Sequence, residues 1–232
     1  MEPILEGITG AIARLVALDA DVLAAASASL AVSGTATALS ILVGIPLGAV
    51  LGLARFRGRT LALSVVNTGM GLPPVAVGLF VATLVWRSGL LGGLDWYCTR
   101  PAIVMAQFAL AAPTVIGLTA VALQSVDPML RTQLTSLGAT PLQSAWLLVR
   151  ESRLLLISAA LAGFGAVISE IGASLMVGCN VKGDTRLLTT AIVLEASKGE
   201  FGSAYALVFI LLTLIFAVSA VTTWAQQRPR PL

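Results

Sequence analysis

An all-α polytopic membrane protein with about five transmembrane helices is the fold class that the sequence predicts. Hydrophobic residues make up 57% of the 232 residues and charged residues only 11%, whereas soluble domains carry about 25% charged residues. The mean hydropathy is +0.96. Several stretches reach the ~20 apolar residues that a helix needs to cross the hydrocarbon core. We therefore predict a single membrane domain over residues 1–232.

Five stretches of the chain are expected to span the membrane, at about residues 29–54, 61–86, 101–123, 154–178 and 204–224. Residues 3–19 are apolar at helical spacing but contain Glu6 and Arg14. That pattern favours a short helix lying on the membrane surface over a span.

Glycines and prolines mark special points in three of these spans. A glycine recurs at every fourth residue from Gly44 to Gly52, which predicts close helix packing. Pro73 and Pro74 should break the second span in the middle of the membrane, where irregular backbone is tolerated only if protein or a wet cavity covers it. This break belongs either to a kinked packing helix or to a segment that lines a pathway. The third span is expected to be broken again at Pro113.

Basic residues are distributed unevenly between the two sides that five spans define. One side has only Asp127 and Glu151 as acids and holds most of the arginines, which are Arg55, Arg57, Arg59, Arg131, Arg150, Arg153, Arg228 and Arg230. An excess of Lys and Arg marks the cytoplasmic side. We therefore expect the N-terminus outside, the C-terminus and residues 127–153 in the cytoplasm, and residues 179–203 as an outer loop. The excess of arginines on the cytoplasmic side explains the net charge of +3, so this charge does not indicate a nucleic-acid partner.

Residues 127–153 predict two short helices joined by a turn. Asp127 before Pro128 is a helix start, and Gly138 suits a left-handed residue that ends this first helix. Thr140, Pro141 and Gln143 then have the pattern of a capping box. A polar helical hairpin within so apolar a chain is expected to dock a partner, although an ordinary interfacial loop would have a similar composition.

The hairpin resembles the coupling loop of the integral-membrane subunits of bacterial ABC importers. The matching part is SLGATPLQSAWLLV, residues 136–149, whereas the acidic EAA part of that motif is replaced by Thr132, Gln133 and Leu134. The resemblance implies a type I importer permease fold and docking of a P-loop ATP-binding subunit. The coupling residues that it implies are Leu137, Gly138, Ala139, Pro141, Leu142, Trp146 and Arg150.

A second and more specific resemblance begins at Ile168. The string ISEIGASLMVGCNVKGDTRLLTTAIVLEASKGEF is similar to the molybdate/sulfate-type permeases and most similar to tungstate permeases. The first span, SLAVSGTATALSILVGIPLGA, supports the same family. The resemblance implies a homodimer in a bacterial or archaeal plasma membrane, a periplasmic or lipid-anchored oxyanion-binding protein and alternating access. Tungstate is the expected anion, with molybdate or sulfate as alternatives.

Glu170 is the one acid within a predicted span, where an ionisable group usually faces protein or water. It can belong to a gate or an inter-subunit contact, or it can be a structural hydrogen-bonding acid near the outer end of the helix. We favour the structural role, because a carboxylate on the path of an anion would repel it.

The predicted outer loop contains the remaining candidates. Lys182 and Arg186 can attract an oxyanion at the outer mouth, or form salt bridges to a binding protein, which we favour. Thr185 is expected to cap a short helix through Ala196. Cys98 and Cys179 both lie on the oxidising side, where a disulfide can form. The sequence does not give their separation, and we expect two free cysteines.

Other functions are disfavoured by what the sequence lacks. It has no histidine, and it has no GxxxxGK[ST] sequence, so we expect neither a cofactor nor catalytic residues and assign ATP hydrolysis to a partner. A secondary carrier often shows inverted repeats, which are not apparent here. An intramembrane hydrolase would need a Ser-His or a two-carboxylate site, which the spans cannot supply.

Overall fold

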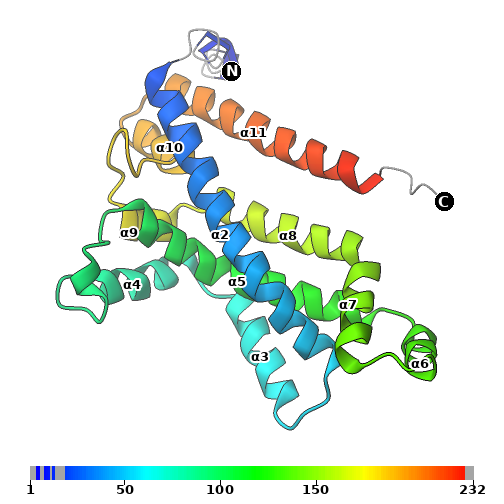
Figure 1. The fold of residues 1–232 in the computed structure, drawn as a ribbon. Coiled ribbons are helices and arrows are strands. Elements are labelled where there is room, and N and C mark those ends of the chain that lie inside the picture. Colours follow the sequence, from blue (N-terminus) through cyan, green and yellow to red (C-terminus); the bar gives the residue numbers. More distant parts are fainter. Residues whose placement is uncertain (1–3, 6–7, 11, 14–18, 228–232) are drawn as a thin grey trace.

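The computed structural model describes residues 4–5, 8–10, 12–13 and 19–227, and the described part of the chain contains helices and no strand (Figure 1). The helices are α2 (Ala20–Leu53), α3 (Arg59–Met70), α4 (Pro74–Val85), η1 (Gly92–Leu94), α5 (Arg100–Gln124), α6 (Pro128–Ser136), α7 (Pro141–Glu151), α8 (Arg153–Ile168), α9 (Gly172–Gly178), α10 (Leu188–Ser197) and α11 (Phe201–Gln227). The surface helix predicted at residues 3–19 falls largely outside the described residues; residues 4–5, 8–10 and 12–13 are helical.

Three described helices are long and apolar enough to cross a membrane: α2, α5 and the part of α11 up to Trp224. The α3–α4 pair, bent by 99°, and the α7–α8 pair, bent by 70°, raise the number to five if each counts as one span. Since α7 is amphipathic and largely exposed, we assign the span in the second pair to α8, with α9 continuing it after a break.

The centre of the molecule is the crossing of α2 over α5 (Figure 1). A Cβ atom added at Gly48 would lie 2.6 Å from the Thr119 Cβ, and one added at Gly44 would lie 2.8 Å from the Val115 Cγ1. The glycine repeat therefore lets the two backbones approach closely, as the sequence predicted.

The prolines act differently according to their neighbours. Pro46 and Pro113 lie inside continuous helices, so the break predicted at Pro113 is wrong. At Pro73–Pro74 the chain does break, because a residue before proline is driven out of the helical region. Pro73 is extended, with φ −62° and ψ 123°, and Pro74 begins α4.

The span predicted at residues 154–178 is interrupted. The helix α8 ends at Ile168 and α9 begins at Gly172, which leaves Glu170 in the break rather than in a continuous helix. The carboxylate of Glu170 accepts hydrogen bonds from the N–H groups of Ala173 and Ser174, at 3.0 and 3.1 Å. These bonds satisfy the first turn of α9, which a continuous helix would have satisfied with its own carbonyls.

The segment predicted as an outer loop, residues 179–203, contains α10, and the start of α10 is buried. Leu188 is fully buried, and its N–H donates to the Ser29 Oγ of α2 at 2.9 Å. Thr185 does not cap this helix, contrary to the prediction, because α10 begins three residues later. Its hydroxyl instead accepts from the Val181 N–H at 2.9 Å and donates to the Gly178 carbonyl, which closes a loop.

The molecule has two ends that differ in the elements they carry. The hairpin end carries α6 and α7 and the turn between α2 and α3. The disulfide end carries the loop before α5, the loop after α9 and the start of α2. Figure 1 shows α6 and α7 far from α4, α9 and α10, with α2, α5, α8 and α11 running between them.

Candidate functional site: a hairpin, a buried polar cluster and a disulfide-linked end

The hairpin is built by local caps that the sequence predicted. The Asp127 carboxylate accepts from the Met129 N–H at 2.8 Å, and Gly138 has φ +79°. The Thr140 N–H donates to the Gln143 side chain at 2.8 Å, and the Gln143 N–H donates back to the Thr140 hydroxyl at 3.3 Å. Each helix of the hairpin therefore has a defined start, and the turn between them is a left-handed glycine.

One face of the hairpin is apolar and exposed to solvent. Leu137 is 83% exposed, Leu142 is 81% exposed and Trp146 is 58% exposed. They line a shallow hollow of about 670 Å³ together with Gly138, Ala139, Gln143 and Leu147. The Arg150 guanidinium lies over the Trp146 ring, 5.3 Å from its centroid. We call this surface the hairpin face. An exposed apolar patch rimmed by polar groups is typical of a protein-binding surface.

The predicted coupling residues gather in two places. Leu137, Gly138, Ala139, Leu142 and Trp146 line the hollow of the hairpin face, and Arg150 borders it. Pro141 lines a second groove, between α7 and the end of α2, to which Ala139 and Leu142 also contribute.

The hairpin is anchored to the membrane helices at two points. Leu148 is the buried residue of α7, and α7 passes into α8 at Ser152. The Arg131 guanidinium of α6 donates to the Leu53 carbonyl at the end of α2, at 3.1 Å. A force applied to the hairpin face would therefore reach α8 through the chain and α2 through this contact.

A buried polar cluster surrounds the break between α8 and α9. Glu170 is 7% exposed, and the Ser174 hydroxyl donates to its carboxylate at 3.3 Å. The Gln107 amide of α5 donates to the same hydroxyl at 3.3 Å, and the Thr189 hydroxyl of α10 donates to the Glu170 carbonyl at 3.1 Å. These hydrogen bonds connect α5, α9 and α10 at the break.

Sequence reasoning missed Gln107 and Ser174. The sequence offered a reason to consider each of them. Gln107 is a polar amide in an apolar span, and Ser174 follows Glu170 by four residues, which would place both on one face of a continuous helix. A buried amide costs free energy unless it is hydrogen-bonded, so a partner for Gln107 could have been sought.

The break between α3 and α4 lies close to the break between α8 and α9. A Cβ atom added at Gly172 would lie 2.6 Å from the Val75 Cγ2, next to Pro74, and 3.5 Å from the Glu170 Oε1. One added at Gly78 would lie 2.6 Å from the Ala173 Cα. The structure therefore brings the predicted pathway residues Pro73, Pro74 and Glu170 to one region of the molecule.

Cys98 and Cys179 form a disulfide, so the expectation of two free cysteines is wrong. Their Cα atoms are 5.1 Å apart, and the Cys98 N–H donates to the Val177 carbonyl at 2.9 Å. The bond joins the loop before α5 to the residue after α9, 81 residues later. Such proximity is a product of the tertiary fold and cannot be read from sequence spacing.

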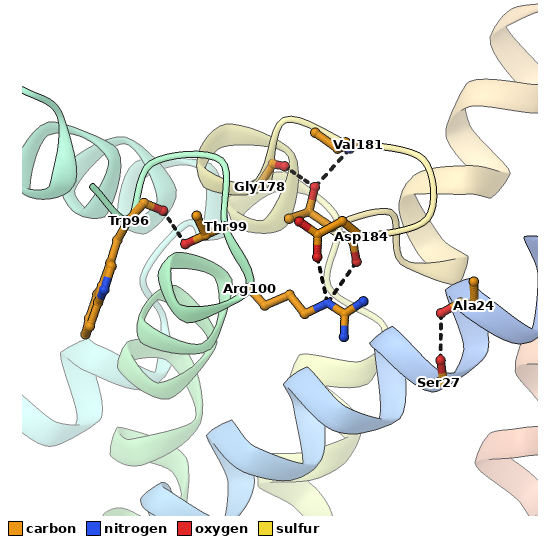
Figure 2. Close-up of polar contacts among 9 residues, drawn as sticks. Ala24, Ser27, Trp96, Thr99, Arg100, Gly178, Val181 and Asp184 are labelled. Carbon is orange, nitrogen blue, oxygen red and sulfur yellow. Dashed lines mark hydrogen bonds and ion pairs between the residues drawn. The ribbon is translucent and has the colours of Figure 1, made fainter. Parts of the chain in front are cut away.

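Arg100 and Asp184 reinforce the same connection. The Arg100 Nε lies 3.0 Å from the Asp184 Oδ1 and donates to the Asp184 carbonyl at 3.0 Å (Figure 2). Neither residue was singled out from the sequence. Thr99, next to Arg100, donates to the Trp96 carbonyl, which orders the turn that leads into α5 (Figure 2).

Lys182 and Arg186, the predicted outer-mouth cations, lie in the segment between α9 and α10 at the disulfide end. The Lys182 Nζ is 2.6 Å from the Asp21 Oδ2, and both side chains are more than half exposed. Such an exposed ion pair contributes little to stability. Arg186 is half-buried and donates to the Asn180 carbonyl at 3.4 Å. Each cation therefore has an intramolecular partner.

The geometry is that of a membrane-spanning chain with a helical hairpin whose exposed face is apolar. The family described as "Binding-protein-dependent transport system inner membrane component" matches residues 44–231. This chain belongs to that family, and it is a multi-pass inner-membrane permease of the ABC type.

Individual relatives lie within the oxyanion permeases. The chain is 38% identical over 221 residues to the tungstate uptake system permease protein TupB of Peptoclostridium acidaminophilum, covering 95% of this chain and 97% of that protein. It is 41% identical over 198 residues to a probable anion ABC transporter permease protein of Haloferax volcanii, covering 83% and 85%. The molybdenum transport system permease protein ModB of Escherichia coli is 28% identical over 207 residues, covering 84% and 90%.

A solved structure has the same fold. It is a crystal structure of an amino acid ABC transporter with histidines, which matches with a TM-score of 0.69 at 16% sequence identity. The match covers 93% of this chain and 97% of that chain. The type I importer permease fold predicted from the sequence is therefore confirmed.

Proposed function

We propose that this chain is the membrane-spanning subunit of an ATP-driven importer of an oxyanion, and that the anion is tungstate. The substrate assignment rests on similarity: two permeases named for tungstate uptake, from Peptoclostridium acidaminophilum and Campylobacter jejuni, match 95% and 96% of this chain. Molybdate is the second candidate, since the ModB relatives match over most of their length at lower identity.

The hairpin face is the observation that carries the ATP-driven part of the proposal. Three large apolar side chains project from it, at 83%, 81% and 58% exposure, and their burial against a partner would be strongly favourable. The chain lacks a phosphate-binding loop sequence, so the partner that supplies the energy is a separate P-loop ATP-binding subunit.

The orientation follows from charge. The hairpin end lies in the cytoplasm, because it carries Arg55, Arg57, Arg59, Arg131 and Arg150. The disulfide end then faces outward, the N-terminus is outside and the C-terminus is cytoplasmic. A periplasmic or lipid-anchored oxyanion-binding protein docks on the disulfide end. A disulfide suits this oxidising side of the membrane.

The mechanism is alternating access in a homodimer, with the anion path between the two copies. The binding protein delivers tungstate to the outer loops, and ATP binding closes the two ATP-binding subunits. The hairpins transmit this closure to α8 and α2, so that the spans open outward to receive the anion. Hydrolysis of ATP returns the inward-open state.

The test is tungstate uptake into vesicles that contain the chain, an ATP-binding subunit and an oxyanion-binding protein from the same organism. Uptake should need ATP and all three components. Uptake by vesicles that lack the ATP-binding subunit would contradict the mechanism and favour a secondary carrier.

The anion is tested separately on the binding protein. Binding calorimetry with tungstate, molybdate and sulfate should give the lowest Kd for tungstate. Sulfate as the tightest ligand would overturn the substrate assignment while leaving the importer mechanism intact.

A further inference from the structure

Two adjoining hollows lie between the end of α2 and the hairpin. One, of about 470 Å³, is polar and is lined by three arginines, Arg55, Arg59 and Arg131. The other, of about 770 Å³, is mainly apolar and lies between α2 and α7. The two share Leu53, Ala54, Arg131 and Leu148 in their walls, so they form one composite site with a charged part and an apolar part.

The arginines of the polar hollow are held in place by the backbone of α2. The Arg59 Nε donates to the Leu51 carbonyl at 2.7 Å, and the Arg131 Nη2 donates to the Leu53 carbonyl at 3.1 Å. A guanidinium has five N–H donors, so each keeps several for a ligand. Cations at the C-terminal end of a helix are also favoured by its dipole. The two groups are therefore positioned before any ligand arrives.

The positive charge in this hollow exceeds the negative charge. None of the three ion pairs in the described part of the chain includes Arg55, Arg59 or Arg131. Arg55 makes no hydrogen bond or ion pair with the residues that the structure describes. Asp127 is the one carboxylate in the wall, and its Oδ1 accepts from the Met129 N–H. Three arginines against one acid favour an anionic ligand.

The neighbouring groove calls for an apolar ligand. Its walls include Pro46, Ala49 and Val50 of α2 and Leu142 and Ala145 of α7. Val50 is 53% exposed. A small anion would fill the polar hollow and leave this groove empty. A molecule with a phosphate beside a hydrocarbon chain would fill both.

We propose that the composite site binds an anionic phospholipid. The phosphodiester lies among Arg55, Arg59 and Arg131, and one acyl chain lies in the groove between α2 and α7. The site is at the end of α2, a candidate membrane span, and so at the depth where a lipid headgroup meets the hydrocarbon. The bound lipid adds further contacts between α2 and the hairpin to the hydrogen bond that Arg131 makes with the Leu53 carbonyl. The inference does not depend on which anion is transported.

The test is native mass spectrometry of the purified full chain, titrated with phosphatidylglycerol and with phosphatidylcholine of the same acyl chains. Phosphatidylglycerol should bind roughly tenfold or more tightly than phosphatidylcholine, because each basic group near the lipid contributes roughly a fivefold factor. Equal binding of the two lipids would overturn the proposal.

Variants locate the site. Arg55→Gln should weaken phosphatidylglycerol binding about fivefold, and it removes no contact within the described protein. The matched control is Arg57→Gln, in the same basic run but outside the walls of both hollows, and it should leave binding unchanged. Equal losses in the two variants would show diffuse surface attraction and contradict a built site.

The apolar half of the site has its own test. Val50→Trp should block the groove and weaken lipid binding while all three arginines remain, with circular dichroism confirming the fold. Glycerophosphoglycerol and inorganic phosphate should fail to displace the lipid at equal concentration. Displacement by either would show that the site recognises a free phosphate and not a lipid.

Discussion

Glu170 shows how one side chain defines a helix boundary inside the membrane. Its carboxylate accepts from two backbone N–H groups and from the Ser174 hydroxyl, and it is nearly buried. An acid at the start of a helix is favoured by the dipole and by the unpaired amides there. The same residue that looked costly in a continuous span is therefore well placed at the start of α9.

Replacing Glu170 should destabilise the protein. Glu170→Ala leaves two buried N–H groups without acceptors, and we expect a loss of about 1–3 kcal/mol in the free energy of unfolding. Glu170→Gln, which keeps one acceptor oxygen, should lose less. The measurement is denaturation in detergent, followed by circular dichroism.

The control for this series is Glu151→Ala at the exposed end of α7. It should change the unfolding midpoint little, because no side-chain contact of Glu151 is lost. If Glu170→Ala and Glu151→Ala had equal midpoints, the hydrogen bonds of Glu170 would not stabilise α9.

The α2–α5 crossing is the tightest contact between long elements. At Gly48, a Cβ atom would come 2.6 Å from the Thr119 Cβ and 2.7 Å from the Ile116 carbonyl oxygen. Because the second of these atoms is backbone, the clash cannot be relieved by turning a side chain. The spacing of the two helices is therefore fixed at this residue.

Gly48→Ala should destabilise the protein by about 1–3 kcal/mol through overpacking. Gly34→Ala, in the same helix, is the matched control, because a Cβ there meets nothing within 4 Å. Thermal unfolding in detergent compares them directly. A lower midpoint for Gly34→Ala than for Gly48→Ala would contradict the crossing described here.

The disulfide links two elements across 81 residues of sequence. Closing a loop of that length stabilises a fold by about 2–5 kcal/mol, mainly by restricting the unfolded chain. Cys98→Ser, Cys179→Ser and the double variant should therefore share the same lowered unfolding midpoint.

Intact-mass analysis after thiol alkylation provides the direct check on the disulfide. The native chain should take up alkylating reagent only after reduction. Labelling of two thiols without reductant would show that the bond is absent.

Local sequence patterns predicted the parts of the fold that local interactions determine. Asp127, Gly138 and Thr140 act within four residues of themselves, and all three caps are found where they were expected. The buried start of α10 and the Cys98–Cys179 bond depend on partners far along the chain, and sequence periodicity carries no information about such distances. The break after Ile168, the continuous helix at Pro113 and the loop closed by Thr185 also differed from expectation, although Glu170 and Thr185 act on residues close to them in the sequence.

At the scale of the whole molecule, the hairpin face is where an external partner can act. It projects beyond the membrane helices and is anchored to both α2 and α8. The proposed importer requires that a partner's movement enters here. The largest apolar side chain on this face is Trp146, which Arg150 covers on one side.

Trp146→Ala should reduce ATP-dependent tungstate uptake severely, because a buried interface tryptophan contributes about 2 kcal/mol or more, roughly a 30-fold loss in affinity. Met129→Ala is the control: Met129 is 65% exposed on α6 and lies outside the hollow. Copurification of the ATP-binding subunit distinguishes lost docking from lost transport. Normal docking and uptake in Trp146→Ala would make the hairpin a simple connector.

The linkages at the disulfide end restrict how the molecule can move. The Cys98–Cys179 bond and the Arg100–Asp184 pair tie the start of α5 to the end of α9. Close backbone contacts at Gly78 and Gly172 tie α9 to α4. We therefore expect these three helices to move together when the molecule changes conformation. The break at residues 71–73 lies between α3 and this unit and has no continuous helical hydrogen-bond ladder, whereas the break at residues 169–171 is held by the hydrogen bonds of Glu170.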